Sequence, residues 1–461
     1  MGADRKLLET AYQTHVVYQR PAFESPGPID DGNWKDHLAD EKYFQAYVKF
    51  FSDKFLAEGP SKTFETGSNL LEKYILSKDA NVIPGKGKDA PNMLSRFYGG
   101  FVHPWIHTGY GAEFNSSGMW AEGLAEACVH GTDAVNLFLP ALFDGQTSSG
   151  GITSVISRVA SLGLSSSQPK KSSPHALEIL ARILKDPDFS PKSLGLSSDN
   201  IVGAVEKVAT ACEAKLLKFF GEWAISPDRE DLLKKTEEVI WMNAVIYTIG
   251  GWSGRNKGED EKKEFNADFF LMHLVTSSLF VPSLISHLSH QSAVLLLRTY
   301  FLVSLVLYVS RGRPAIPIEE FYKSTTATPS QPGPQPTPSE KTYVDESALE
   351  LGDDPGKAAW KGVANHLTPN PWLPIVQTTL LHPNEHLCKT QRSLLHFANL
   401  FGETAPGHFE SLGTEGGLEG AKFLDGTLFV RAAGLTANRL GWMREGQAER
   451  GWDRDGFYYD D

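Results

Sequence analysis

Two short histidine motifs carry the chemistry that this sequence suggests. His103 and His107 occur in the stretch "HPWIH", and His382 and His386 occur far later in the stretch "HPNEH". Residues four positions apart lie on one face of an α-helix, and proline is favoured at the first helical position. Each motif therefore predicts a helix that begins near its proline and directs two imidazoles to one point, where they could bind a metal.

A third histidine, His273, lies in the apolar segment "ADFFLMHLVTSSLFVPSLISHLSHQ" (267–291), which we predict to be helical. A charged imidazolium would be costly there, whereas a neutral histidine could ligate a metal. An isolated HxxxH pair or buried histidine is more often structural, but the three segments together make a metal site as good an interpretation as a structural one. We keep His382 as a reserve ligand. Four other histidines are expected to be packing or capping residues: His287, His290, His366 and His396.

Lys389 follows His386 by about one helical turn. A protonated amine beside a metal would be repelled, so a structural lysine should pair with an acid such as Glu385. Burial would lower the pKa of the amine. A neutral amine can react with carbon dioxide to form a carbamate, which would turn the cation into an oxygen ligand. The residues alone do not decide between a structural lysine paired with an acid and a carbamate that ligates a metal.

The composition excludes several function classes. Hydrophobic residues make up 41% of the chain and charged residues 22%, as in an ordinary soluble globular protein. The net charge of −12 disfavours nucleic acid, because an acidic surface repels phosphate backbones. Three widely spaced cysteines form no CxxC pair, and the charged N-terminus lacks the apolar core of a secretory signal. We therefore expect a cytoplasmic protein.

Helical periodicity dominates the chain and predicts a mainly α fold. The clearest helical segments span 6–19, 41–59, 197–225 and 226–251, the last ending at Gly250-Gly251. The apolar run 292–309 is broken by Arg298 and Thr299, which favours a buried core helix over a membrane span. We accordingly expect no membrane partner.

We predict one large, bundle-like helical domain over residues 1–461, with long loop insertions. A Ser/Gly-rich loop is expected at 144–174, and a flexible Pro-rich insertion at 324–340. The histidine motifs fall on opposite sides of this insertion. A site shared by them requires the two parts of the chain to form one domain.

Other catalytic motifs are not supported. Gly85, Gly87 and Ala90 match a dinucleotide fingerprint but lie between two prolines instead of joining a strand to a helix. We find no Walker A motif and no GxSxG elbow. The "HFE" stretch at 408–410 has the spacing of an iron-binding HxE pair, but its Gly/Glu-rich surroundings indicate a solvated turn.

Four stretches together resemble the questin oxidase-like family: "FYGGFVHPWIHTGYGAEF", "DFFLMHLVTSSLFVPSL", "NPWLPIVQTTLLHPNEHLCKTQRSLLHFANLFG" and "FVRAAGLTANRLGW". They extend from about residue 90 to 445, most of the chain. The resemblance implies a fungal enzyme of polyketide secondary metabolism that opens the central ring of an anthraquinone to give a benzophenone-type product. Family members have been described as Baeyer–Villiger-type oxidases, which would normally imply a flavin.

The resemblance also implies a non-haem iron site built from histidines and a modified lysine. The ligands it implies are His103, His107, His273, His386 and a carboxylated Lys389. We assign the catalytic roles to His386 and Lys389. Fe(II) would be the cofactor, molecular oxygen and an aromatic polyketide the substrates, and NADPH an indirect reductant. The enzyme would then be a dioxygenase.

Flat substrates need aromatic walls, and Trp105, Tyr110 and Trp372 are candidates because they neighbour the motifs, although each could equally lie in the core. Two alternatives stay open. One is a flavin- or NADPH-dependent Baeyer–Villiger-type monooxygenase in which the histidines serve binding or acid–base roles. The other is a non-enzymatic helical binding protein in which every histidine is structural.

Overall fold

The computed structural model describes residues 1–19, 21, 23–83, 90–147, 173–226, 228–257, 263–334, 370–414 and 416–458. Most of the predicted Ser/Gly-rich loop, the Pro-rich segment after residue 334, Gly85 and Gly87 of the dinucleotide-like match, and His366 lie outside these residues. The start of the Pro-rich segment is described. There Pro329 is buried and packs against Gly434.

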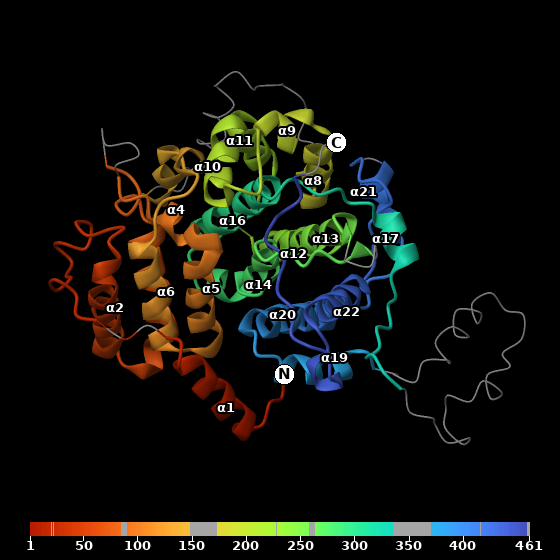
Figure 1. Cartoon of the computed structure of the whole chain (residues 1–461). Coiled ribbons are helices and arrows are strands. Elements are labelled where there is room, and N and C mark those ends of the chain that lie inside the picture. Colours follow the sequence, from red (N-terminus) through yellow and green to blue (C-terminus); the bar gives the residue numbers. More distant parts are fainter. Residues whose placement is uncertain are drawn as a thin grey trace, which may run out of the picture.

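The described residues fold mainly into helices, which confirms the predicted fold class (Figure 1). The α-helices are α1 (Arg5–Val16), α2 (Phe44–Glu58), α3 (Thr63–Leu71), α4 (Met93–Phe97), α5 (Gly99–Phe114), α6 (Ser117–Val129), α8 (Ala176–Lys185), α9 (Pro191–Leu194), α10 (Ile201–Ala211), α11 (Glu213–Glu222), α12 (Arg229–Val245), α13 (Gly251–Ser253), α14 (Met272–Ser278), α15 (Val281–Ile285), α16 (His290–Ser310), α17 (Ile318–Ser324), α19 (Trp372–Leu381), α20 (Glu385–Phe401), α21 (Glu410–Thr414) and α22 (Leu428–Leu440).

Short elements complete the described chain. The 3₁₀ turns are η1 (Glu41–Tyr43), η2 (Pro60–Lys62), η5 (Val135–Leu137), η6 (Pro140–Thr147), η8 (Pro187–Phe189), η11 (Ala421–Phe423) and η12 (Met443–Glu445). The π-helical turns are η3 (Glu72–Leu76) and η9 (Ile246–Gly250). Among the described residues, β-structure is limited to the antiparallel pair β1 (Asn256–Lys257) and β2 (Lys263–Glu264) and one isolated bridge. The parallel sheet of a dinucleotide-binding unit is therefore not found there.

Helix α16 runs through the middle of the molecule, next to α14 and α12, while α5, α6 and α2 lie on one side and α20 and α22 below (Figure 1). By length and composition α16 is apolar enough to cross a membrane, but its whole apolar stretch is buried inside the protein. Its one guanidinium, Arg298, lies over the ring of Phe220 and donates to the Phe220 carbonyl oxygen. This agrees with the prediction of a core helix.

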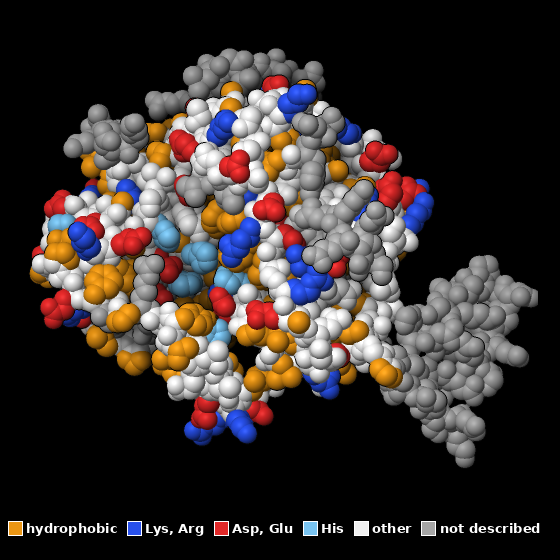
Figure 2. Space-filling model, in the orientation of Figure 1, with side chains coloured by type: hydrophobic (Ala, Val, Ile, Leu, Met, Phe, Trp, Pro, Cys, Tyr) orange, Lys and Arg blue, Asp and Glu red, His pale blue; other side chains and the backbone are white. Residues whose placement is uncertain are grey.

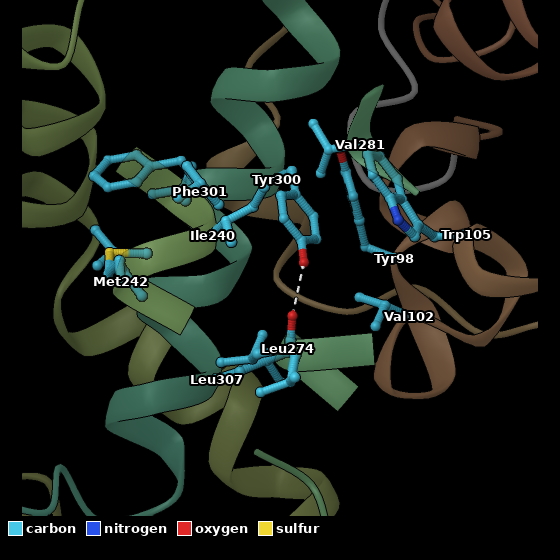
Figure 3. Packing of buried hydrophobic residues seen from close by; sticks show 14 of the residues in the cluster. Tyr98, Val102, Trp105, Ile240, Met242, Leu274, Val281, Tyr300, Phe301 and Leu307 are labelled. Atoms are coloured by element: carbon cyan, nitrogen blue, oxygen red, sulfur yellow. Dashed lines mark hydrogen bonds between the residues drawn. The ribbon is translucent and has the colours of Figure 1, made fainter. Parts of the chain in front are cut away.

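A stack of aromatic rings fixes α5 against α14 and α16 (Figure 3). The Trp105 ring lies on Tyr300 at 4.6 Å with the planes 9° apart, and its Nε1 donates to the Ser277 carbonyl at 3.0 Å. The Tyr300 hydroxyl donates to the Leu274 carbonyl at 3.2 Å. Trp105 is thus fully buried in the core. Of the two roles considered for Trp105, substrate wall and core residue, the structure supports the core.

Three helix predictions need correction. The segment 267–291 is not one helix: α14 ends at Ser278 and α15 begins at Val281, because Pro282 cannot continue an α-helical hydrogen-bond ladder. The segment 197–225 is divided at Cys212. In contrast, the helix predicted to stop at Gly250-Gly251 continues through a π-helical turn to Ser253.

Candidate metal centre

His103 is held in place by an unusual backbone turn. Gly100, Phe101 and Val102 all adopt left-handed φ and ψ angles, and the right-handed part of α5 begins directly after them. This confirms a helix start near Pro104. Positive φ is rare for a β-branched residue such as Val102. The Gly100 carbonyl accepts a hydrogen bond from His103 Nδ1 at 2.5 Å. A carbonyl can only accept, so Nδ1 carries the proton and Nε2 keeps its lone pair.

His273 is fixed in the same way from α14. Its Nδ1 donates to the Phe269 carbonyl at 2.7 Å, one helical turn earlier. Its Nε2 is buried and has no hydrogen-bond partner. Burial lowers the pKa of His273 well below its ordinary value, and it lowers that of His103 to about 4, so both rings are neutral near pH 7. An unpartnered buried lone pair is unfavourable unless it binds something.

His386 comes from the first turn of α20. Asn384 caps this helix by accepting from the His386 backbone N–H at 3.1 Å. His386 Nδ1 lies 2.9 Å from a Glu385 carboxylate oxygen, and this interaction holds the pKa of Glu385 down to about 2. An ionised carboxylate accepts the Nδ1 proton, which leaves Nε2 as the lone-pair nitrogen. A carboxylate or carbonyl behind each imidazole is the usual arrangement around metal-ligating histidines.

The three histidines converge although they come from α5, α14 and α20. One nitrogen of each lies within 4.8 Å of the others. The His273 ring centroid is 4.9 Å from that of His103 and 5.5 Å from that of His386. Figure 2 shows histidine side chains gathered in a hollow of the surface, with acidic side chains beside them. The orphaned His273 nitrogen and the fixed tautomers fit a metal ion bound by three imidazoles.

Lys389 lies one turn after His386 on α20 and completes this group. Burial lowers the pKa of its amine, whereas Glu385 and Glu126 act in the opposite direction. Its charge adds a small contribution to the lowering of the pKa of His103 and of His273, after burial and the neighbouring histidines. Among the described residues, no carboxylate lies within 4.0 Å of its Nζ. The expected ion pair with Glu385 is therefore not formed at contact distance.

His107 lies beside the three histidines but in a different donor group. Its ring centroid is 6.3 Å from that of His103. His107 Nδ1 lies 3.0 Å from Glu126 and 3.6 Å from Glu122, and these three side chains form a second cluster with the donor spacing of a metal site. Sequence reasoning did not identify the two glutamates. Their i, i+4 spacing on α6 was the available signal, but such pairs are usually solvated.

His382 does not contribute to the centre. It precedes α20 and accepts from the Asn384 N–H at 3.1 Å through Nδ1, while its Nε2 donates to the Leu440 carbonyl at 3.2 Å. Neither nitrogen is left for a metal, so the role of His382 as a reserve ligand is wrong.

The other histidines considered from the sequence lie outside the centre. His287 packs on Phe64, and His290 starts α16. The HxE pair is exposed, as expected of a solvated turn.

One aromatic side chain, Phe269, packs against two of the three histidines. The Phe269 ring lies 5.0 Å from both His273 and His386, a contact that no sequence motif indicated. Tyr110 is half-buried and stacks on Phe114, and Trp372 is half-buried against the core. The structure shows neither of these two residues in contact with the three histidines.

The chain was compared with known proteins. A model of the family described as questin oxidase-like matches residues 1–394. Among curated proteins, the chain is 27% identical over 290 residues to the Baeyer-Villiger monooxygenase dmxR6 of Cryptosporiopsis sp., covering 61% of this chain and 54% of that protein. It is 23% identical over 325 residues to Oxidoreductase AflY of Aspergillus parasiticus, covering 68% and 56%.

A third relative is the Baeyer-Villiger oxidase AgnL3 of Paecilomyces divaricatus, which is 27% identical over 293 residues, covering 62% of this chain and 54% of that protein. The chain spans about half the length of the curated relatives it matches. The family model, in contrast, extends over most of the chain and contains all three converging histidines. The chain belongs to the questin oxidase-like family.

Proposed function

We propose that this protein is an iron-dependent oxygenase that opens the central ring of a hydroxylated anthraquinone with molecular oxygen. The observation that carries the proposal is the convergence of three histidines, one nitrogen of each lying within 4.8 Å of the others, with Nδ1 of His103 and of His273 already bonded to backbone carbonyls. The names of the relatives, a Baeyer-Villiger monooxygenase, a Baeyer-Villiger oxidase and an oxidoreductase, suggest the reaction class.

The donor set suits iron. His103, His273 and His386 would hold Fe(II), and Lys389, carboxylated on Nζ, would add an oxygen donor. His107 is a further candidate nitrogen donor, with Glu126 behind its Nδ1. When bound, Fe(II) would supply the one-electron chemistry that ground-state oxygen needs in order to react with a closed-shell organic molecule.

The residues of this chain would also prepare the site for the reaction. The backbone carbonyls of Gly100 and Phe269 hold two imidazoles in the ligating tautomer. The Phe269 ring contacts His273 and His386 and carries the Arg454 guanidinium 3.9 Å from its centroid, so it would shield the two imidazoles from solvent. We propose that the substrate enters in reduced form, that the bond between a ring-junction carbon and the neighbouring carbonyl carbon breaks, and that NADPH acts only upstream as the reductant.

The competing function is a Baeyer–Villiger-type monooxygenase, which the relatives' names favour. Oxygen isotopes separate the two. The purified chain, loaded with Fe(II), is given a chemically reduced dihydroxyanthraquinone under ¹⁸O₂, and the product is analysed by mass spectrometry. Two heavy atoms in the ring-opened product, without NADPH in the assay, support the dioxygenase. One heavy atom, with turnover that depends on NADPH or flavin, contradicts it.

A further inference from the structure

A separate cavity lies behind the left-handed turn that positions His103. It has a volume of about 230 Å³ and is bordered by α5, η5, α10 and α16. Tyr98, Phe101 and Phe138 supply aromatic walls, and Val303 and Val306 of α16 lie among the aliphatic ones. None of the three converging histidines lines it. It is therefore a site distinct from the candidate metal centre, although Gly100 and Phe101 belong to both neighbourhoods.

The walls define the kind of molecule that fits. The Tyr98 hydroxyl is occupied, because it lies 2.9 Å from the Leu296 carbonyl and 3.0 Å from Thr299 Oγ1, so Tyr98 presents only its ring to the cavity. Phe101 packs against Phe270 at 4.4 Å. An apolar cavity of about 150 Å³ in another protein holds benzene. The larger volume here leaves room for a second fused ring.

One charged side chain borders this apolar space. Asp133 lines the cavity, where burial and then Glu206 raise the pKa of its carboxyl group, while His130 and the Gly100 backbone act in the opposite direction. A carboxylate has about four lone-pair positions, so it retains capacity for a donor from a ligand. A hydroxyl group is the donor that suits an otherwise apolar cavity, because it costs less to bury than a cation.

We propose that this cavity binds a phenolic aromatic molecule of one or two fused rings, whose hydroxyl donates to Asp133 and whose ring lies against Phe101 and the aliphatic face of α16. A ligand in this cavity would influence the position of His103, since it would contact the turn whose Gly100 carbonyl accepts the hydrogen bond from His103. The site does not depend on metal or on the reaction proposed above.

The probe for this site is 2-naphthol, whose own fluorescence reports binding to the full chain. We expect saturable binding with one molecule per chain. Val306→Phe and Val303→Phe each fill the cavity and should weaken binding at least about tenfold. Val303 is half-buried, so its variant keeps the test valid if Val306→Phe does not fold. His386→Ala should bind the probe like the parent.

Asp133→Asn should weaken 2-naphthol binding about threefold or more, because it removes a charge-assisted hydrogen bond. The same variant should bind 2-methoxynaphthalene, which has the same rings without the donor, as the parent does. Parent-like affinity in both valine variants overturns the proposal, as does absence of saturable binding. Loss of binding in His386→Ala would instead place the probe at the histidines and likewise overturn it.

Discussion

The ring centroids of His103 and His273 lie 4.9 Å apart, although one histidine comes from α5 and the other from α14. Both donate Nδ1–H to a backbone carbonyl, so both keep the lone pair of Nε2 free of the proton. His273 is buried and His103 half-buried, and these two neutral imidazoles do not satisfy each other, since each directs its only N–H to a backbone carbonyl. A bound cation accounts for the arrangement better than core packing does.

Glu385 should act as a positioning residue for His386. Glu385→Gln keeps the shape of the side chain but removes the charge that accepts the His386 Nδ1 proton. We expect the affinity for Fe(II) or Mn(II) to fall about tenfold or more, as for other outer-shell substitutions. Titration calorimetry on the metal-free chain measures this. The matched control is Glu230→Gln, an exposed glutamate in the first turn of α12, which should bind metal like the parent.

The left-handed turn before His103 should tolerate no side chain at Gly100. A Cβ there would lie 2.6 Å from the His130 ring, and φ is +56°. Gly100→Ala should lower the free energy of unfolding by about 1–2 kcal/mol from the backbone alone. It should also weaken metal binding by displacing the carbonyl that holds His103. Gly118→Ala, in helix α6 where a Cβ meets nothing within 4 Å, is the control; it should leave metal binding unchanged and should not lower the free energy of unfolding, since alanine favours a helix over glycine. Equal behaviour of the two variants would contradict the role of the turn.

Lys389 should contribute an oxygen donor only after reaction with carbon dioxide. Lys389→Ala should lose metal affinity and regain part of it in formate or acetate, because a small carboxylate can occupy the vacated space. Chloride at the same ionic strength controls for screening. If no carboxylate restores binding, or if Lys389→Ala binds metal as the parent does, the carbamate role is wrong.

His175 should make stability depend on pH at a place remote from the candidate metal centre. It caps α8 through Nδ1, and burial lowers its pKa to about 4 from 6.5. The unfolded chain therefore binds this proton first, and stability is lost as pH falls from about 6.5 toward 4. The loss from this group is at most about 3 kcal/mol. His175→Asn keeps a capping acceptor without the titration, so denaturant unfolding at pH 7 and pH 4.5 should differ less than in the parent.

The sequence was most informative where short-range rules apply. Pro104 marked the helix start, and the apolar character of 292–309 marked a core helix. The expectation that a helix begins near the proline of each HPxxH motif failed at His382. Asn384 caps α20 and leaves that histidine outside the helix, with both of its nitrogens bonded to the backbone. Spacing alone cannot show where a helix begins to within one turn.

The long-range features of the site were beyond sequence reasoning. No local pattern shows that α5, α14 and α20 meet, since α14 contacts both α5 and α20 only through tertiary packing, of which the bond from Trp105 to the Ser277 carbonyl is one part. The sequence also does not predict the three left-handed residues before His103, because Phe101 and Val102 are residue types that normally avoid positive φ. The family resemblance, in contrast, singled out His103, His273 and His386 before any of them was seen to be close.

The most direct test of the account is metal analysis of the purified chain beside His103→Ala, His273→Ala and His386→Ala variants, with an absorbance scan for flavin. The account predicts about one iron per chain in the parent, loss of that iron in all three variants, and no flavin absorbance. Circular dichroism must show that each variant keeps its helical content. A parent without bound metal after reconstitution with Fe(II), or variants that retain their iron, would contradict the account.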